Sequence, residues 1–170
     1  FKDGMRLVFN NVRKFGRVWL LAHPQEVLGE LGPEPLDIRL TLEEFYRMMK
    51  SHNRRLKPLL MDQTFIAGLG NIYTDEALHL AKLHPLKRSN SLTKEQIENL
   101  LRAIHSVLTE GIRFNGASID WAYRGGGFQN ILHVYGRNGK PCPECGTPIQ
   151  RIVIGQRGTY FCPHCQRLDK

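Results

Sequence analysis

The spacing of apolar residues predicts two amphipathic helices in the middle of the chain. Each begins with a capping box, Thr41-Leu-Glu-Glu44 and Thr93-Lys-Glu-Gln96, in which the first and last side chains satisfy backbone N–H groups of the first turn. The second helix is the longer, and Asn115-Gly116 should end it. The apolar positions on one face are Leu42, Phe45, Met48 and Met49 in the first helix, and Ile97, Leu100, Leu101, Ile104, Val107, Leu108 and Ile112 in the second.

A third helix is expected to begin after Gly68-Leu-Gly70 and to reach about Leu83. Glycines at this place let the backbone approach a partner closely, and the free N–H groups at a helix start favour a phosphate. Asn71 is therefore either a phosphate donor or an ordinary helix cap in a turn between two helices. The sequence pattern leaves both alternatives open.

Three stretches have the composition of β-strands. Residues 5–9 and 16–22 are rich in Val, Leu, Phe and Trp, and residues 128–137 are expected to form a strand that enters a C-terminal hairpin. Asp3-Gly4 is a tight-turn sequence that needs a strand before it, so we expect the chain to be the C-terminal part of a longer protein. Proline and glycine gather in residues 29–36, which we interpret as an ordered linker.

These elements predict an α+β fold with several domains. The expected division is residues 1–36 for the last strands of a β-domain, 37–124 for a helical module and 125–170 for a metal-binding hairpin. There is no internal repeat and no segment of low complexity.

Composition and charge narrow the class of partner. The 170 residues include 24 Lys and Arg against 16 Asp and Glu, which gives a formal net charge of +8. Such a charge suits a polyanion, nucleic acid before others, although many proteins carry it without binding one. A hydrophobic fraction of 41% is enough for a core, and no apolar run is long enough to span a membrane.

The four cysteines of the chain form one motif near the C-terminus. Cys142-Pro-Glu-Cys145 is followed after sixteen residues by Cys162-Pro-His-Cys165, which is the spacing of a structural zinc site with a β-hairpin between its two knuckles. Two disulfides are the alternative, but all the cysteines belong to the motif and we expect no secretory signal sequence. We therefore predict one zinc ion, four thiolate ligands and a cytoplasmic location.

The hairpin has a candidate phosphate-binding tip. In Gly155-Gln-Arg-Gly-Thr159 two glycines flank a Gln-Arg pair, so the chain must turn sharply and can approach another molecule. Arg157 offers donors in the fixed geometry that phosphate oxygens accept. A solvated turn without a binding role explains the pattern equally well.

Two further segments have open alternatives. Residues 10–16 are either an ordinary turn with Phe15 packed in the core, or a wedge in which Phe15 slides between bases and Arg13 fills the vacated space. The basic run from Lys50 to Lys57 is either a solvated helix end or a set of phosphate contacts.

The chain resembles the bacterial formamidopyrimidine-DNA glycosylases of the Fpg/Nei superfamily. The matching motifs occur in the family's order and extend over nearly the whole chain. They are Asn11-Val-Arg13-Lys-Phe15-Gly16, Leu31-Gly-Pro-Glu-Pro-Leu36, Leu60-Met-Asp-Gln63, Gly68-Leu-Gly-Asn-Ile-Tyr73, Phe128-Gln129, Val134-Tyr-Gly-Arg137, Pro141-Cys142, Gly146-Thr-Pro-Ile149 and Gln156-Arg-Gly-Thr159.

The resemblance implies a fold and a function. The fold is an N-terminal β-sandwich, a helix–two-turns–helix module and a zinc finger, and the activity is excision of oxidised purines from duplex DNA followed by strand cleavage. Arg13 and Phe15 would fill the gap left by the flipped base. The implied phosphate contacts are Asn53, Arg54, Asn71 and Arg157. Arg157 also matches the position assigned to the second elimination step, and the base-capping loop would comprise Ser118, Asp120, Trp121, Ala122 and Tyr123.

Two departures from the family pattern limit these expectations. The family's nucleophile is an N-terminal proline followed by a glutamate, with a catalytic lysine later in the first domain, whereas residue 1 here is Phe1 and Lys57 lies in the helical module. We therefore expect the chain by itself to bind DNA, as a monomer, without cleaving it. The segment from Ser118 to Phe128 is also shorter than the family's loop and ends in three glycines.

Two other functions fit parts of the sequence. A non-catalytic zinc ribbon that binds nucleic acid or protein would explain the cysteines and the charge. A glycosylase of the endonuclease VIII type, which removes oxidised pyrimidines, would share the helical module, although the residues around Phe128-Gln129 and Gln156-Arg157 favour the purine type.

Overall fold

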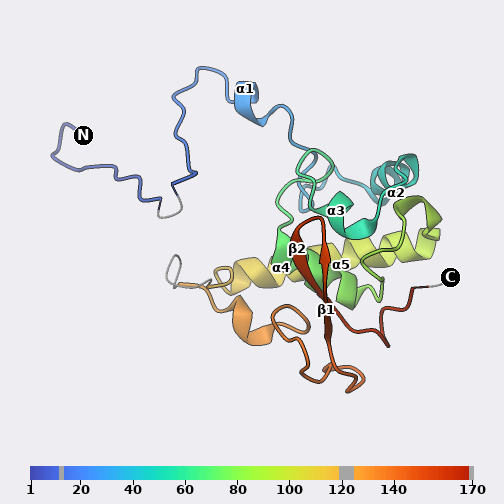
Figure 1. The fold of residues 1–170 in the computed structure, drawn as a ribbon. Helices are drawn as coiled ribbons and strands as arrows, with labels where there is room; N and C mark the ends of the chain where they lie inside the picture. The colour runs from blue at the N-terminus through green and yellow to red at the C-terminus, as the bar shows by residue number, and fades with distance from the viewer. Residues whose placement is uncertain (12–13, 119–124, 169–170) are drawn as a thin grey trace.

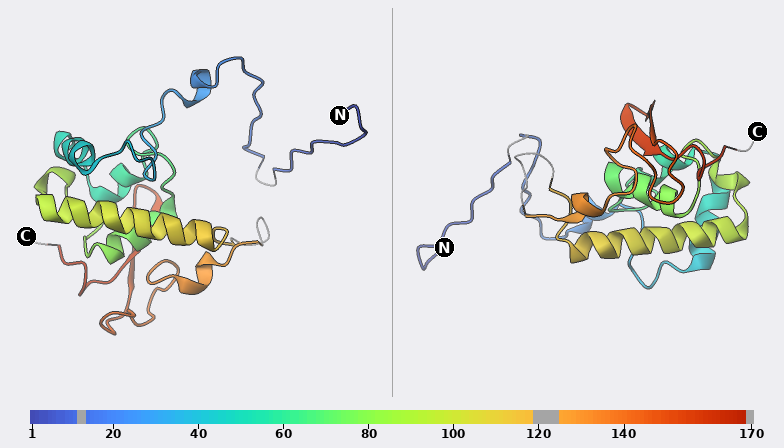
Figure 2. Two further views of the ribbon diagram at one scale, coloured as in Figure 1. Left: turned by 180° about the vertical axis from the view of Figure 1, so that it is seen from behind. Right: turned by 90° about the horizontal axis from the view of Figure 1, so that it is seen from below.

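The computed structural model describes residues 1–11, 14–118 and 125–168 (Figure 1). A body of helices carries one small hairpin, and the N-terminal residues extend away from it (Figures 1 and 2). The elements are α1 (Gln25–Leu28), α2 (Leu42–Ser51), α3 (Leu56–Leu60), α4 (Asn71–Leu80), the 3-10 helix η1 (Ser89–Ser91), α5 (Lys94–Arg113), the 3-10 helix η2 (Phe128–Ile131), β1 (Gln150–Ile154) and β2 (Arg157–Phe161).

The predicted capping boxes are confirmed at both long helices. At α2, the N–H of Glu44 donates to Thr41 Oγ1 at 3.2 Å, and the N–H of Thr41 donates to the Glu44 carboxylate at 2.9 Å. Thr93 and Gln96 make the same exchange at the start of α5. The helix α5 ends where predicted, since the two residues after its C-cap, Asn115 and Gly116, have positive φ.

Helices α2 to α5 enclose one hydrophobic core. The long helix α5 runs across the back of the body and packs against both α2 and α4 (Figure 2). The predicted apolar positions of α2 and α5 supply much of this core. Its fully buried members include Phe45, Met49, Leu56, Leu59, Leu60, Ile66, Ile97, Leu100 and Ile104.

The predicted C-terminal hairpin is confirmed and lies against α4. Strands β1 and β2 pair antiparallel with Gln150 opposite Phe161 and Ile154 opposite Arg157. The two residues between the strands, Gly155 and Gln156, have φ of 55° and 60°. Positive φ at both positions is what a two-residue type I′ hairpin turn requires. A second small cluster of Val134, Cys142, Ile149 and Cys162 lies beneath the hairpin.

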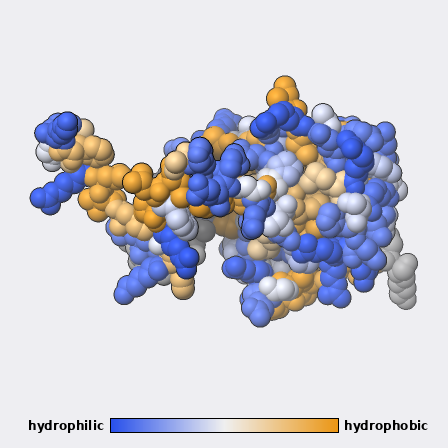
Figure 3. Space-filling view, turned by 90° about the horizontal axis from the view of Figure 1, so that it is seen from above, coloured by the Kyte–Doolittle hydropathy of each residue, from blue (hydrophilic) through white to orange (hydrophobic). Residues whose placement is uncertain are grey.

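The predicted strands at residues 5–9 and 16–22 are wrong. Neither stretch forms a strand, and their apolar side chains are largely exposed, including Leu7 at 86% and Leu20 at 102%. A strand is stable only beside another strand, and β1 with β2 is the whole of the sheet in the described residues. Figure 3 shows the resulting apolar surface along the N-terminal segment.

The predicted strand at residues 128–137 is also wrong. The segment begins as η2 and continues in an irregular path, because a side chain rather than a second strand binds its backbone. The N–H groups of His133, Val134 and Tyr135 all donate to the carboxylate of Glu76 on α4.

The segment before α2 is tied to the helical body, as expected of an ordered linker. The N–H of Gly32 donates to the carbonyl of Gln63 at 2.8 Å, and the N–H of Ala67 donates to the carbonyl of Pro33 at 3.0 Å. The division at residues 36 and 124 stays a prediction. Among the described residues no helix has the length and apolar composition needed to cross a membrane.

Candidate metal centre and nucleic-acid interface

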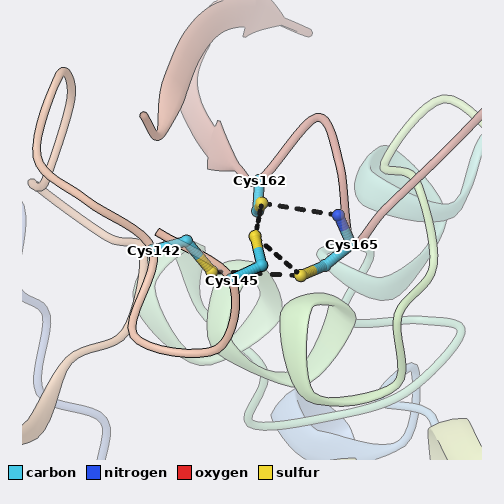
Figure 4. Close-up of side chains that lie close together, drawn as sticks. All are labelled: Cys142, Cys145, Cys162 and Cys165. Carbon is cyan, nitrogen blue, oxygen red and sulfur yellow. Dashed lines mark hydrogen bonds between the residues drawn. The ribbon is translucent and has the colours of Figure 1, made fainter. Parts of the chain in front are cut away.

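The four cysteines predicted as zinc ligands converge at the base of the hairpin (Figure 4). All four sulfur atoms lie within 4.8 Å of one another. The Sγ–Sγ separations are 3.4 Å for Cys145–Cys162, 3.4 Å for Cys145–Cys165 and 4.0 Å for Cys142–Cys165. A tetrahedron with zinc–sulfur bonds of about 2.3 Å has edges of about 3.8 Å, so the cluster has the size of a zinc site.

The electrostatics of the thiols point to a bound cation. Hydrogen bonds from Thr147 lower the pKa of Cys145 to about 6, whereas burial raises the pKa of Cys162 and of Cys165. Four thiols this close cannot all ionise unless a positive ion balances their charge. The site is that of one structural zinc, because four protein sulfurs complete its coordination and leave no position for water.

Helix α4 connects the helical body to the metal-binding hairpin. Four of its polar side chains contact the C-terminal part of the chain: Asn71, Asp75, Glu76 and His79. They stand at positions i, i+4, i+5 and i+8, which share one face of a helix. The helix therefore presents a polar seam to the hairpin and an apolar face to the core.

Glu76 binds the segment that leads into the zinc site. Its carboxylate accepts the three backbone N–H groups of residues 133–135 at 2.8–2.9 Å, and it lies 3.1 Å from His133 Nδ1. Burial raises the pKa of Glu76, but the hydrogen bonds from His133 and the backbone outweigh it, so the net shift is downward. A buried carboxylate with so many donors is ionised and rigid.

A buried ion pair lies at the centre of the same seam. Lys57 Nζ is 2.7 Å from Asp75 Oδ1, and the two side chains are 1% and 0% exposed. Lys57 also donates to the carbonyl of Asn71 at 2.9 Å, and Asp75 Oδ2 accepts the N–H of Tyr160 on β2 at 2.9 Å. Burial lowers the pKa of Lys57 and raises the pKa of Asp75 to about 6, and the attraction between the two groups opposes both shifts. The pair thereby joins α3, α4 and β2.

The structure brings two predicted phosphate contacts, Asn71 and Arg157, close together. Asn71 Nδ2 donates to the carbonyl of Gly158 at 3.1 Å and to the hydroxyl of Tyr135 at 3.4 Å, while its Oδ1 has no hydrogen-bond partner. Arg157 precedes Gly158 in β2, is exposed, and lies near enough to Lys57 for its charge to lower the pKa of Lys57. A basic, donor-rich corner therefore forms where α4 begins and the hairpin turns.

The other predicted DNA contacts lie elsewhere. The side chain of Phe15 is 87% exposed in the N-terminal segment, so the alternative that packs it in the core is wrong. Arg13 falls outside the described residues. Asn53 accepts hydrogen bonds from Arg88, and Arg54 is paired with Asp62 at 2.7 Å, so both are engaged within the protein.

The base of the predicted capping loop is closed by hydrogen bonds. Ser118 Oγ donates to the carbonyl of Gly126 at 2.7 Å and accepts its N–H at 3.0 Å, and Gln129 bonds both residues. A Cβ at Gly126 would lie 2.2 Å from the carbonyl oxygen of Gly116, so this closure needs glycine. The remaining predicted loop residues, Asp120, Trp121, Ala122 and Tyr123, lie outside the described residues.

Sequence reasoning missed the polar residues that hold the site together. Lys57 appeared to be part of a solvated or phosphate-binding basic run, yet it is buried. Its apolar neighbours Leu56, Leu59 and Leu60 were the available indication. Asp75 and Glu76 stand at helical spacing from Asn71 and directly before the apolar pair Ala77-Leu78, which could have marked them as buried partners.

Two family models match the chain. The model of the formamidopyrimidine-DNA glycosylase H2TH domain matches residues 31–122, which is more than half of the chain, and the model of the zinc finger found in FPG and IleRS matches residues 139–168. The chain belongs to the formamidopyrimidine-DNA glycosylase family. The first match covers helices α2 to α5, and the second covers the four cysteines and the hairpin.

Known members of the family are similar over most of this chain. The formamidopyrimidine-DNA glycosylase of Ligilactobacillus salivarius is 46% identical over 174 residues, and that of Pediococcus pentosaceus is 47% identical over 175 residues. Each alignment covers 98% of this chain and 63% of the relative, so the chain spans less than two thirds of the length of these proteins.

Solved structures of the family have the same fold. The crystal structure of MutM (Fpg) from Thermus thermophilus superposes with a TM-score of 0.79 at 47% identity, covering 84% of this chain and 56% of that one. A complex between Lactococcus lactis Fpg and DNA containing an abasic site superposes equally well, with a TM-score of 0.79 at 40% identity, covering 85% and 55%.

Proposed function

We propose that this chain is the DNA-binding part of a bifunctional DNA glycosylase that excises oxidised purines, such as 8-oxoguanine and formamidopyrimidines. Damaged duplex DNA is the partner, and a monomer is the binding unit. The alternative of a non-catalytic zinc ribbon is disfavoured by the family membership of the helical module.

The observation that carries this proposal is the hydrogen bond from Asn71 to Gly158. It joins the start of α4 to the hairpin at the residue that follows the exposed Arg157, so a helix N-terminus and an arginine of β2 lie near each other. Free backbone N–H groups at a helix start and a guanidinium both bind phosphate oxygens, the first through dipoles and the second through charge. We infer that the two residues grip the phosphates next to a lesion.

Charge and relatives support a DNA partner. The net charge of +8 favours a polyanion. Lactococcus lactis Fpg has been crystallised with DNA containing an abasic site and, as a mutant, with DNA containing Fapy-dG. A formamidopyrimidine lesion in a relative with 40% identity favours the oxidised-purine class over oxidised pyrimidines for this chain.

The remaining roles follow from the family. Arg13 and Phe15 would enter the base stack from the N-terminal segment, and the exposure of Phe15 suits that role. Ser118 and residues 120–123 would cover the flipped base. Base release and strand cleavage need an amine nucleophile that forms a Schiff base with the sugar, followed by β- and δ-elimination, with Arg157 assisting the last step. We expect the 170 residues by themselves to bind DNA without performing this chemistry.

The binding proposal is tested by fluorescence anisotropy. A labelled duplex with a tetrahydrofuran abasic analogue is titrated with the zinc-loaded chain at several salt concentrations. Arg157→Ala should weaken binding by about 10-fold or more and reduce the salt slope by about one, because one charge-assisted phosphate contact is lost. Arg102→Ala removes an equal charge from the outer face of α5 and is the matched control. Equal affinities for the two variants would refute the phosphate grip.

The chemical part of the proposal needs a separate assay. Borohydride should trap no covalent complex between the 170-residue chain and abasic DNA, and should trap one when a family N-terminal domain with its proline is fused to the chain. A chain that is trapped by itself would show that the nucleophile lies within these residues.

A further inference from the structure

A buried histidine of α4 contacts one of the zinc ligands. His79 Nε2 lies 3.4 Å from Cys142 Sγ, within the range of a hydrogen bond to sulfur. Both residues are 3% exposed, so water does not compete for the contact. Cys142 is thus the ligand at which the helical body reaches the metal centre directly.

Metal binding determines the direction of this hydrogen bond. A zinc-bound cysteine is a thiolate and has no proton, so its sulfur can only accept. Nε2 of histidine carries a proton in one neutral tautomer and in the charged form, so it can be the donor in either state. We propose that His79 is a positioning residue that donates a hydrogen bond to the zinc-bound thiolate of Cys142 and thereby raises the affinity of the site for zinc.

The negative charge of the metal centre makes an N–H donor to its sulfurs stabilising. Four thiolates and one Zn²⁺ leave a net charge of about −2 in a partly buried cluster, and N–H donors spread that charge. Cys145 accepts hydrogen bonds from Thr147, and Cys162 accepts the N–H of Cys165 at 3.4 Å, so both have donors within the zinc-binding segment itself. Cys142 has its side-chain contact with His79 of the helical body. His79 serves the buried ligand on the α4 side.

The same bond couples the metal to the docking of the hairpin. If the N–H···S bond stabilises the zinc-bound state, zinc must stabilise the docked position of α4 against Cys142 by an equal factor. Outer partners of metal ligands typically change metal affinity by about 10- to 100-fold. The proposal therefore extends the site to a residue outside the four-cysteine motif, and it holds whether or not the chain acts on DNA.

A packing role is the alternative that the experiment must separate. The His79 ring stacks on His133, with centroids 5.8 Å apart and planes 22° from parallel. His79→Phe keeps an aromatic ring for this contact and removes the donor. His79→Gln removes the ring but places an amide N–H near the position of Nε2. The two variants thus separate the effect of ring packing on zinc binding from the effect of the hydrogen bond.

The test measures zinc affinity by competition with a colorimetric chelator and records the charge-transfer bands of the cobalt-substituted chain. His79→Phe should bind zinc about 10-fold more weakly and shift the sulfur-to-cobalt band to lower energy, since an unbonded thiolate is the better electron donor. His79→Gln should restore both values toward those of the unmodified chain. His84→Phe changes another buried histidine, which packs on Phe161, and serves as the control without a sulfur contact.

Two outcomes would overturn the proposal. If His79→Phe binds zinc within about two-fold of the unmodified chain and its cobalt spectrum is unchanged, the hydrogen bond has no effect on the metal. If His79→Phe and His79→Gln lower the zinc affinity equally with no change in the cobalt band, His79 acts by packing. The spectral readout also decides the case if either variant is destabilised, because the band reports on the sulfur ligands alone.

Discussion

Removing the Lys57 ammonium from the buried ion pair should be among the most damaging single changes in the helical body. Lys57→Met keeps an unbranched chain of similar length but leaves the Asp75 carboxylate without its cation, 0% exposed. Taking away one partner of a buried ion pair typically costs about 3–5 kcal/mol, because the other charge stays desolvated. The same change also leaves the carbonyl of Asn71 without the lysine donor.

The structure also limits the size of this loss. Asp75 can escape an unpaired charge by taking up a proton, and burial raises its pKa even in the intact pair. In the unfolded chain the carboxyl ionises near its ordinary pKa of 3.8. Holding it protonated at pH 7 therefore costs about 4 kcal/mol, from some three pKa units at about 1.4 kcal/mol each. At pH 5 the corresponding cost is below about 2 kcal/mol.

Urea unfolding of the zinc-loaded chain at pH 7 and pH 5 measures both quantities. Lys57→Met should lower the free energy of unfolding by about 3–5 kcal/mol at pH 7, with a markedly smaller loss at pH 5. The second change Asp75→Asn, made in the Lys57→Met background, should recover part of the loss because no charge is left buried. Lys94→Met at the exposed start of α5 is the control and should change stability by less than about 0.5 kcal/mol. A Lys57→Met loss below about 1 kcal/mol, or an equal loss at both pH values, would refute the reasoning.

Three further predictions concern the connections between the helical body and the hairpin. The pKa of Glu76 in the folded chain lies below its ordinary 4.5, so its contribution to stability is present above pH 4.5 and is lost as the pH falls through the folded pKa. Glu76→Gln should therefore lower the free energy of unfolding at pH 7 and weaken its decrease in acid, and an unchanged decrease below pH 4.5 would contradict this. Removing zinc with a chelator should loosen the hairpin and abolish binding to abasic DNA, so anisotropy that survives complete metal loss would disprove the coupling. Gly126→Ala places a Cβ 2.2 Å from the Gly116 carbonyl oxygen and should lower the melting temperature by several degrees, measured by calorimetry against Gly139→Ala, where nothing lies within 4 Å although the φ is positive.

Local rules predicted the helices and the metal ligands well. The Thr41 and Thr93 capping boxes are sequence-local, since both partners lie within one turn, and the structure has both. The two Cys-x-x-Cys motifs are likewise local, and only their meeting had to be inferred. The turn at Gly155 was predicted from its glycine and from the spacing of the two cysteine motifs, which requires a hairpin between them.

The errors arose where distant parts of the chain decide the structure. Residues 5–9 have strand composition, but a strand also needs a neighbour, which composition does not supply. Residues 133–135 were predicted as part of a strand, but they do not pair with one. Glu76, more than fifty residues earlier, accepts the backbone N–H groups that a neighbouring strand would bind. Lys57 looked solvated because its partner Asp75 lies in the next long helix. Local sequence can indicate that each member of such a pair is buried, but it does not identify the distant partner.

The polar seam of α4 restricts how this protein can vary. Asn71, Asp75, Glu76 and His79 all reach the C-terminal part of the chain only because successive residues turn by about 100° around the helix axis. Inserting or deleting one residue between Asn71 and His79 would rotate one end of this face away from the other, so that either the basic corner or the metal centre would lose its support. Length changes should therefore be excluded from this helix.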